Sequence, residues 1–148
     1  MTNQTLSDAL VAAKLIDRSV AEKVLVEART TEQSVEDIVL GRNLISDVDL
    51  AKLKAKALKV PYQRIDPDAV PEEAFRLLPR ETMQSYQMVP ISRNRDLLVV
   101  GMVHPDDVPA QEALRFLAKQ ERLTLGVYLV TAADVEAVPA VRPDPAGH

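Results

Sequence analysis

Apolar positions in the amino-terminal part of the chain, up to Ala57, repeat as two copies of one pattern. When residues 5–28 are placed over residues 34–57, at an offset of 29, the large aliphatic positions coincide. The clearest coincidences are Leu6 with Val35, Leu10 with Val39, Leu15 with Leu44 and Ile16 with Ile45. Within each copy the apolar residues recur every three or four positions, which is the spacing of one buried helix face. The pattern predicts two helices in each copy, separated by a turn that ends in Leu-Ile.

Hydroxyl residues followed three positions later by an acid mark four helix starts in the same stretch. The pairs are Thr5 with Asp8, Ser19 with Glu22, Ser34 with Asp37 and Ser46 with Asp49. In such a pair the hydroxyl accepts a hydrogen bond from a free backbone N–H, and the acid interacts with the positive helix end. Helices this short are not stable alone, so we expect their apolar stripes to form a packed core.

After residue 58 the pattern predicts short strands mixed with helices. A run with apolar residues at nearly every position, Leu97–Val103, is typical of a central strand covered on both faces. The expected elements are an extended segment at 59–65, a helix after Pro71, another over 81–86, a hairpin of strands 88–91 and 97–103, a helix over 110–118, a strand over 123–130 and a helix over 131–138.

The predicted fold class is therefore α+β. We expect an amino-terminal four-helix subdomain from a tandem repeat at residues 1–58. A small α/β subdomain with a three-stranded sheet flanked by helices is expected at residues 59–138. The Pro-rich residues 139–148 are expected to be a disordered tail or a linker.

Composition narrows the class of protein. The chain has 148 residues, of which 47% are hydrophobic and 27% are charged. These proportions are those of soluble globular domains. A net charge of −4 and few aromatic residues argue against binding of nucleic acid. The sequence has no apolar run long enough to span a bilayer, no secretory signal pattern and no cysteine. These features are compatible with a cytoplasmic protein that does not insert into a membrane.

Catalytic and metal-binding patterns are absent from the sequence. The four glycines cannot be arranged into a Walker phosphate loop or a dinucleotide fingerprint. Two histidines are too few for a histidine-based metal site, and we interpret His104 as a turn residue. The acidic pairs Glu72-Glu73 and Asp106-Asp107 suit helix starts better than a cation site. The sequence therefore predicts a protein that is not an enzyme and has no cofactor.

Residues 5 to about 138 resemble the amino-terminal domain of the ATPases that drive type II secretion and type IV pilus assembly. The helical part is similar to the tandem motif of the cyclic di-GMP-binding version, in which two copies of equal length are joined by a short spacer. The later part shares short motifs in the same order. They are Val60-Pro-Tyr62, Leu77-Leu-Pro79, Val89-Pro-Ile91 and Gly101-Met-Val-His-Pro-Asp106, the last in place of Ala-Met-x-Asp-Pro-x.

The polar positions of the tandem motif are changed in this chain. Thr5 and Ser34 stand at the motif's arginine, Ser7 and Glu36 at its first glycine, Lys14 and Asn43 at its second glycine, and Ala28 and Ala57 at its glutamine. Arginine offers a fork of donors to a phosphate, and glycine lets a ligand approach the backbone. Thr5 and Ser34 are instead expected to cap helices, and Glu36 adds a negative charge. These changes argue against cyclic di-GMP as a ligand.

The resemblance implies a non-catalytic adaptor or regulatory domain that acts by docking to other proteins. Its partners would be the platform protein of a secretion or pilus system, the assembly ATPase, or both. Such partners would recruit the chain to the inner face of the membrane. The helical half or the open edge of the sheet is the expected docking surface. The alternative is a cyclic di-GMP sensor with altered contacts.

Overall fold

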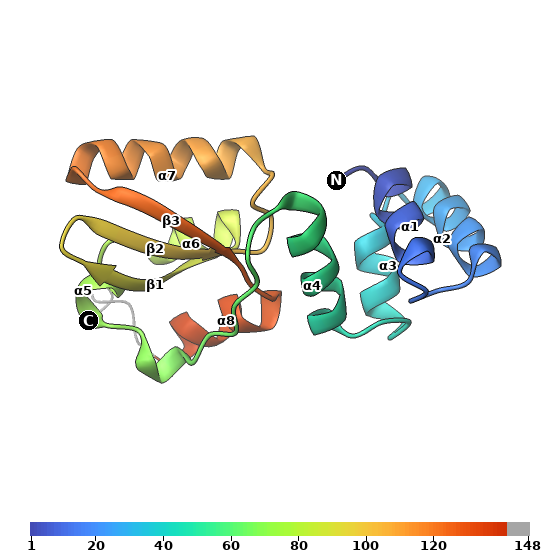
Figure 1. Ribbon diagram of the computed structural model, residues 1–148, viewed down its shortest axis with the longest axis horizontal. Coiled ribbons are helices and arrows are strands. Elements are labelled where there is room, and N and C mark those ends of the chain that lie inside the picture. Colours follow the sequence, from blue (N-terminus) through green and yellow to red (C-terminus); the bar gives the residue numbers. More distant parts are fainter. Residues whose placement is uncertain (142–148) are drawn as a thin grey trace. The chain divides into compact units, whose positions relative to one another are not determined.

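The computed structural model describes residues 1–141, which contain eight α-helices, a short 3₁₀ helix and three strands (Figure 1). In chain order they are α1 (Asn3–Ala12), α2 (Arg18–Thr31), α3 (Val35–Gly41), α4 (Asp47–Leu58), η1 (Pro67–Ala69), α5 (Glu72–Phe75), α6 (Arg80–Tyr86), β1 (Met88–Asn94), β2 (Leu97–Met102), α7 (Val108–Glu121), β3 (Thr124–Leu129) and α8 (Ala132–Val141). The chain divides into two compact units, Met1–Leu53 and the part from Lys54 onward. The α+β fold class expected from the sequence is confirmed.

The first unit is built from the repeated apolar pattern. The side chains of Leu10, Val35 and Val39 are completely buried at the centre of its core. The other buried members of this cluster are Leu6, Val24, Ala28, Ile38, Ile45 and Leu50. The Asn3 side chain also accepts a hydrogen bond from the Val35 backbone N–H at 3.0 Å, linking the starts of α1 and α3. The predicted helix faces are therefore the faces that pack together.

Two of the four predicted helix starts are confirmed. The hydroxyls of Ser34 and Ser46 each accept a hydrogen bond from the backbone N–H three residues later, at 3.0 Å. The predicted starts at Thr5 and Ser19 are wrong. The Thr2 hydroxyl caps α1 by accepting from the Thr5 N–H at 3.1 Å, and α2 begins after Asp17, whose extended backbone precedes it without a side-chain cap. A hydroxyl caps a helix only where its own residue, directly before the first turn, has an extended backbone. The spacing of residues along the sequence does not reveal that conformation.

The second unit contains a mixed sheet in the order β1-β2-β3. Strands β1 and β2 form the predicted antiparallel hairpin, and β3 pairs parallel to β2 after the α7 crossover. The β1–β2 register shifts between Pro90 and Ser92. Pro90 lacks a backbone N–H, so it is tolerated in an edge strand such as β1. The central position predicted for Leu97–Val103 is confirmed.

The two faces of β2 are covered to different extents. Leu98, Val100 and Met102 are at most 1% exposed, whereas Leu97 and Val99 are only partly buried. At Gly101 an added Cβ would lie 2.6 Å from a Val130 methyl carbon. One face of β2 is thus fully packed, and the backbone approaches its neighbours closely at Gly101.

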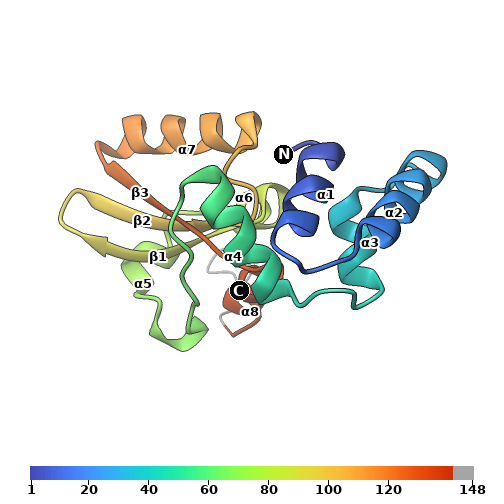
Figure 2. The same cartoon turned by 45° about the vertical axis from the view of Figure 1, so that its right-hand side comes forward.

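Helices lie on both sides of the sheet in the second unit. In Figures 1 and 2, α7 runs beside β3, while α5, α6 and α8 gather near β1. The expected extended segment pairs with the end of β3, where the Leu129 N–H donates to the Pro61 carbonyl at 2.8 Å. Helix α8 runs to Val141, and the rest of the expected tail, residues 142–148, lies outside the described residues.

Candidate functional site

The candidate site is the pair of turns that end α1 and α3, one in each copy of the repeat. Lys14 and Asn43 occupy equivalent positions of the two copies and have left-handed backbone, with φ of 60° and 54°. Neither residue is a glycine, and both side chains are exposed. Glycine takes this conformation without a steric penalty, whereas a residue with a Cβ does not. Each turn therefore has the backbone of a glycine turn without the glycine.

The same hydrogen bonds close both turns. In the first copy the Lys14 N–H donates to the Val11 carbonyl and the Leu15 N–H to the Leu10 carbonyl, both at 3.0 Å. The equivalent bonds of the second copy are Asn43 to Leu40 at 3.1 Å and Leu44 to Val39 at 2.9 Å. This pattern is a Schellman motif, which satisfies the last free carbonyls of a helix. The repeat seen in the sequence is therefore also a repeat of backbone geometry.

The arginine and first-glycine positions of the motif lie on α1 and at the start of α3. Thr5 is exposed, and its hydroxyl is 2.8 Å from that of Thr2, whereas Ser34 caps α3 as expected. Ser7 is 2% exposed inside α1. Glu36 lies in the first turn of α3 and is partly buried.

The two glutamine positions differ in burial. Ala28 is 3% exposed and belongs to the core of the first unit. Ala57 is exposed on α4 and belongs to the second unit. The two copies of the repeat therefore diverge where their second helices end.

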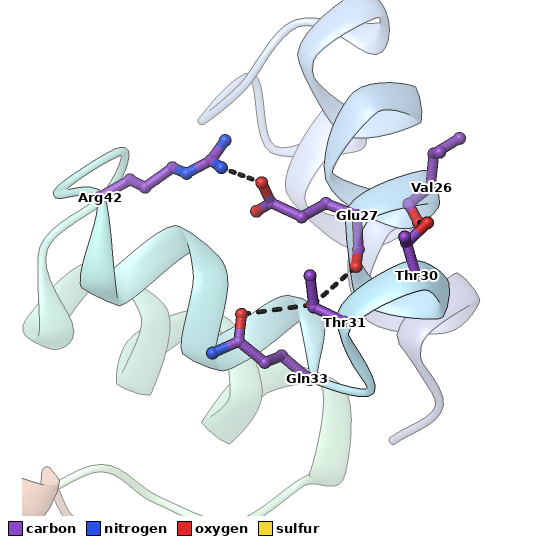
Figure 3. A network of polar contacts seen from close by, with 6 residues as sticks. All are labelled: Val26, Glu27, Thr30, Thr31, Gln33 and Arg42. Carbon is purple, nitrogen blue, oxygen red and sulfur yellow. Dashed lines mark hydrogen bonds and ion pairs between the residues drawn. The ribbon is translucent and has the colours of Figure 1, made fainter.

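An ion pair lies beside the second turn. The guanidinium of Arg42, the residue before Asn43, contacts the carboxylate of Glu27 on α2 (Figure 3). One turn further along α2, the Thr31 hydroxyl donates to the Glu27 carbonyl at 2.7 Å. The Arg42 side chain is 57% exposed. Because water screens exposed charges, the pair contributes only modestly to stability. The contact nevertheless orients the Arg42 side chain toward Glu27 on α2.

A buried lysine in the second unit was not identified from the sequence. Lys54 is 5% exposed, and its ammonium donates to the Val103 carbonyl at 2.9 Å and lies 3.4 Å from Nδ1 of His104. The only signal in the sequence is that Lys54 follows Leu50 by four positions on an apolar stripe.

The turn after β2 has the structure that the sequence predicted. The Asp107 N–H donates to the His104 carbonyl at 3.1 Å, so His104 is a turn residue. The Asp107 carboxylate caps α7 by accepting from the Ala110 N–H at 3.2 Å. These residues start the helix, as expected for that acidic pair.

Groups of three acidic or histidine side chains that could hold a metal ion do not occur among residues 1–141. In the same part of the chain, every helix is too short or too polar to cross a membrane.

A family model decides where the chain belongs. Residues 58–138, more than half of the chain, match the model of the MshEN domain. This chain belongs to the MshEN domain family. The family is the N-terminal domain of type II secretion and type IV pilus ATPases, so the resemblance stated from the sequence is confirmed. The motor domain of those ATPases is a different region, and this chain corresponds to the regulatory one.

Solved structures of MshE and XpsE have the same fold. A structure of MshE with cdg, cyclic di-GMP, matches with a TM-score of 0.73 and 24% identity, over 88% of this chain and 93% of that one. The N-terminal domain of XpsE matches with a TM-score of 0.70 and 16% identity, over 93% of this chain and 94% of that one. A second crystal form of XpsE gives 0.55 and 18% over the same shares. No curated protein matches the chain.

The expectation that argued against cyclic di-GMP as a partner is wrong in the light of these matches. A protein with this fold, MshE, has been solved with that ligand, which conflicts with the expectation. The sequence argument weighed side chains that have changed, such as Thr5 and Ala28. The sequence did not reveal that Lys14 and Asn43 have the left-handed backbone conformation typical of glycine turns.

Proposed function

We propose that this MshEN domain is a non-catalytic adaptor that docks to another protein of a type II secretion or type IV pilus assembly system. The observation that carries the proposal is the match of residues 58–138 to the N-terminal domain of the ATPases. Large apolar side chains left in water on the same unit, Val108 at 58% and Phe116 at 70% exposure, support a docking role.

The proposed partners are the platform protein of the system, its assembly ATPase, or both. Docking to a platform protein would hold this domain in the cytoplasm at the inner face of the membrane. We further propose that residues 1–58 and 59–138 act as the two subdomains of the adaptor. In this arrangement the domain positions a motor and performs no chemistry itself.

Capture experiments test the proposal. The purified chain is immobilised and offered, separately, the cytoplasmic part of the cognate platform protein and the cognate ATPase motor domain. The proposal predicts saturable capture of at least one of the two. Capture of neither would refute it. ATP hydrolysis by the chain above a buffer blank would refute the non-catalytic part.

A second candidate function is binding of cyclic di-GMP with altered contacts. Two observations favour it, namely the fold shared with MshE solved with cdg and the left-handed turns at Lys14 and Asn43. The fit is incomplete, because Thr5 and Ser34 cannot replace the arginine forks of the motif. Lys14 does place an exposed ammonium at the first turn, where it could pair with a phosphate.

Calorimetric titration of the chain with cyclic di-GMP tests this candidate. Binding should release heat, and Lys14→Glu should weaken it by about tenfold because it reverses a charge at the turn. Lys23→Glu, a change on an exposed face of α2, is the matched control and should leave the affinity unchanged. If excess nucleotide at micromolar protein gives no heat, this candidate fails.

A further inference from the structure

Helix α7 carries an outward face that no other part of its unit covers. Five exposed residues of α7 follow one another at intervals of four, three, one and three positions, namely Val108, Glu112, Arg115, Phe116 and Lys119. These five residues are called the α7 face. On the opposite side of the helix the core positions are Ala110 and Leu114, which are at most 2% exposed. In both Figure 1 and Figure 2, no described element of the second unit lies beyond α7.

Phe116 is the most unusual residue of the α7 face. The chain has two phenylalanines, and Phe75 is 5% exposed whereas Phe116 is 70% exposed. Val108, two turns before it, is 58% exposed. A large aromatic side chain at the centre with polar residues at the rim is the usual composition of a protein–protein interface. Phe116 is therefore placed to act as the anchor of such a contact.

The charges around Phe116 are mainly positive. Arg115 and Lys119 lie one turn apart on the same side of the helix, and Arg122, with φ of 56°, directly follows its last residue. No ion pair among residues 1–141 involves any of these three cations. Glu112 is the one acid of the α7 face. Glu121, beside Arg122, is also exposed, so the helix with its cap residue carries three cations and two acids, against a net charge of −4 for the whole chain.

We propose that the α7 face binds an acidic amphipathic helix of a partner protein. An apolar side chain of that helix packs on Phe116, and its carboxylates pair with Arg115, Lys119 and Arg122. This inference rests on the proposed docking function and names the surface and the chemistry of the partner. Complementary charges on two such faces speed association and fix the orientation of the complex.

An anionic membrane is the competing occupant, and the α7 face suits it less well. Glu112 lies one turn before Phe116, where lipid phosphates would repel it. One phenylalanine and one valine also offer little apolar area for insertion into a bilayer. The structure therefore favours a protein segment over lipid headgroups.

The first experiment uses the partner that the capture assay identifies. Phe116→Ser and the pair Arg115→Glu with Lys119→Glu should each weaken capture by about tenfold or more, because they remove the anchor and reverse the charge. Val26→Ser, which alters an apolar residue 61% exposed on α2, is the control and should leave capture unchanged. If the wild type is captured and both α7 variants are captured equally well, the docking function stands and this inference is wrong.

The second experiment does not depend on a captured partner. Two labelled synthetic peptides are titrated with the full chain, each an amphipathic helix with a leucine stripe, one flanked by glutamate and the other by lysine. We expect the glutamate peptide to bind, with an affinity that falls several-fold between about 50 mM and about 200 mM salt, and Phe116→Ser to abolish it. Equal binding of both peptides, binding of neither, or tighter binding to phosphatidylglycerol vesicles would overturn the inference.

Discussion

The ammonium of Lys54 donates a hydrogen bond to the backbone carbonyl of Val103 at a distance of 2.9 Å. Lys54 is 5% exposed and lies in the last turns of α4, while Val103 directly follows β2. A backbone acceptor inside a protein is costly to leave unpaired, so within the second unit this contact fastens the end of α4, from Lys54 onward, to the end of the central strand. It also keeps the long lysine side chain in one orientation beside His104.

Replacement of Lys54 by methionine should lower the free energy of unfolding by about 1–3 kcal/mol, because methionine has a similar shape but cannot donate. The Val103 carbonyl would then remain buried without its partner. Lys52→Met, on an exposed position of the same helix, should change the free energy by less than about 0.5 kcal/mol. Urea denaturation of the two variants measures the difference, and equal midpoints would contradict the assigned contact.

The two strand glycines should respond in opposite ways to alanine. In Gly101→Ala the new Cβ would lie 2.6 Å from a Val130 methyl carbon. We therefore expect a loss of about 1–3 kcal/mol in the free energy of unfolding. In Gly126→Ala the nearest atom is a Val99 methyl carbon at 3.7 Å, an ordinary contact. Here alanine should stabilise by up to about 1 kcal/mol, because glycine is unfavourable within a strand.

Thermal unfolding of both glycine variants tests this pair. A destabilised Gly126→Ala would show that the packing at β3 is misjudged. An unchanged unfolding temperature in Gly101→Ala would show that Val130 moves aside without cost.

Glycine at the two left-handed turns should stabilise the first unit. Lys14→Gly removes a Cβ from a residue with φ of 60°. We expect a gain of about 1 kcal/mol in the free energy of unfolding. Asn43→Gly should gain less, because asparagine takes this conformation with less strain than lysine. Lys14→Ala, which removes the charge and keeps the Cβ, is the control and should give no gain. A loss of stability in Lys14→Gly, measured by urea denaturation, would mean that the turn is not left-handed in solution.

The ion pair between Glu27 and Arg42 should contribute little, because the Arg42 side chain is 57% exposed. A double-mutant cycle with alanine at both positions should give a coupling free energy below about 1 kcal/mol, since water screens the charges. The coupling should shrink further in about 1 M salt. Chemical denaturation of the four proteins measures it, and a coupling of several kcal/mol would show that the pair is far less hydrated than its exposure indicates.

Sequence reasoning succeeded where burial is periodic. The four-helix repeat and the central strand were predicted because buried positions recur every three or four positions in a helix and nearly continuously in a covered strand. It failed at the starts of α1 and α2. These helices begin after Thr2 and Asp17, whose extended backbone angles the spacing of residues does not reveal. The left-handed conformation of Lys14 and Asn43 was missed because neither residue is a glycine, the residue that usually indicates such a turn.

Contacts between residues far apart along the chain also could not be predicted from the sequence. Lys54 and Val103 are separated by 49 positions, and only the fold brings them together. Phe116 had a weak signal, because it falls outside the apolar stripe of its helix, the one that contains Ala110, Leu114 and Leu117. An aromatic residue outside such a stripe could have been identified as a surface contact.

The most direct test of the docking role is an affinity measurement between the full chain and the cytoplasmic part of its cognate platform protein, repeated with the cognate motor domain. A docking domain should give a saturable isotherm with at least one of them, with a dissociation constant in the micromolar range or tighter. If neither isotherm saturates while the chain is shown by circular dichroism to be folded, the proposed adaptor function is wrong.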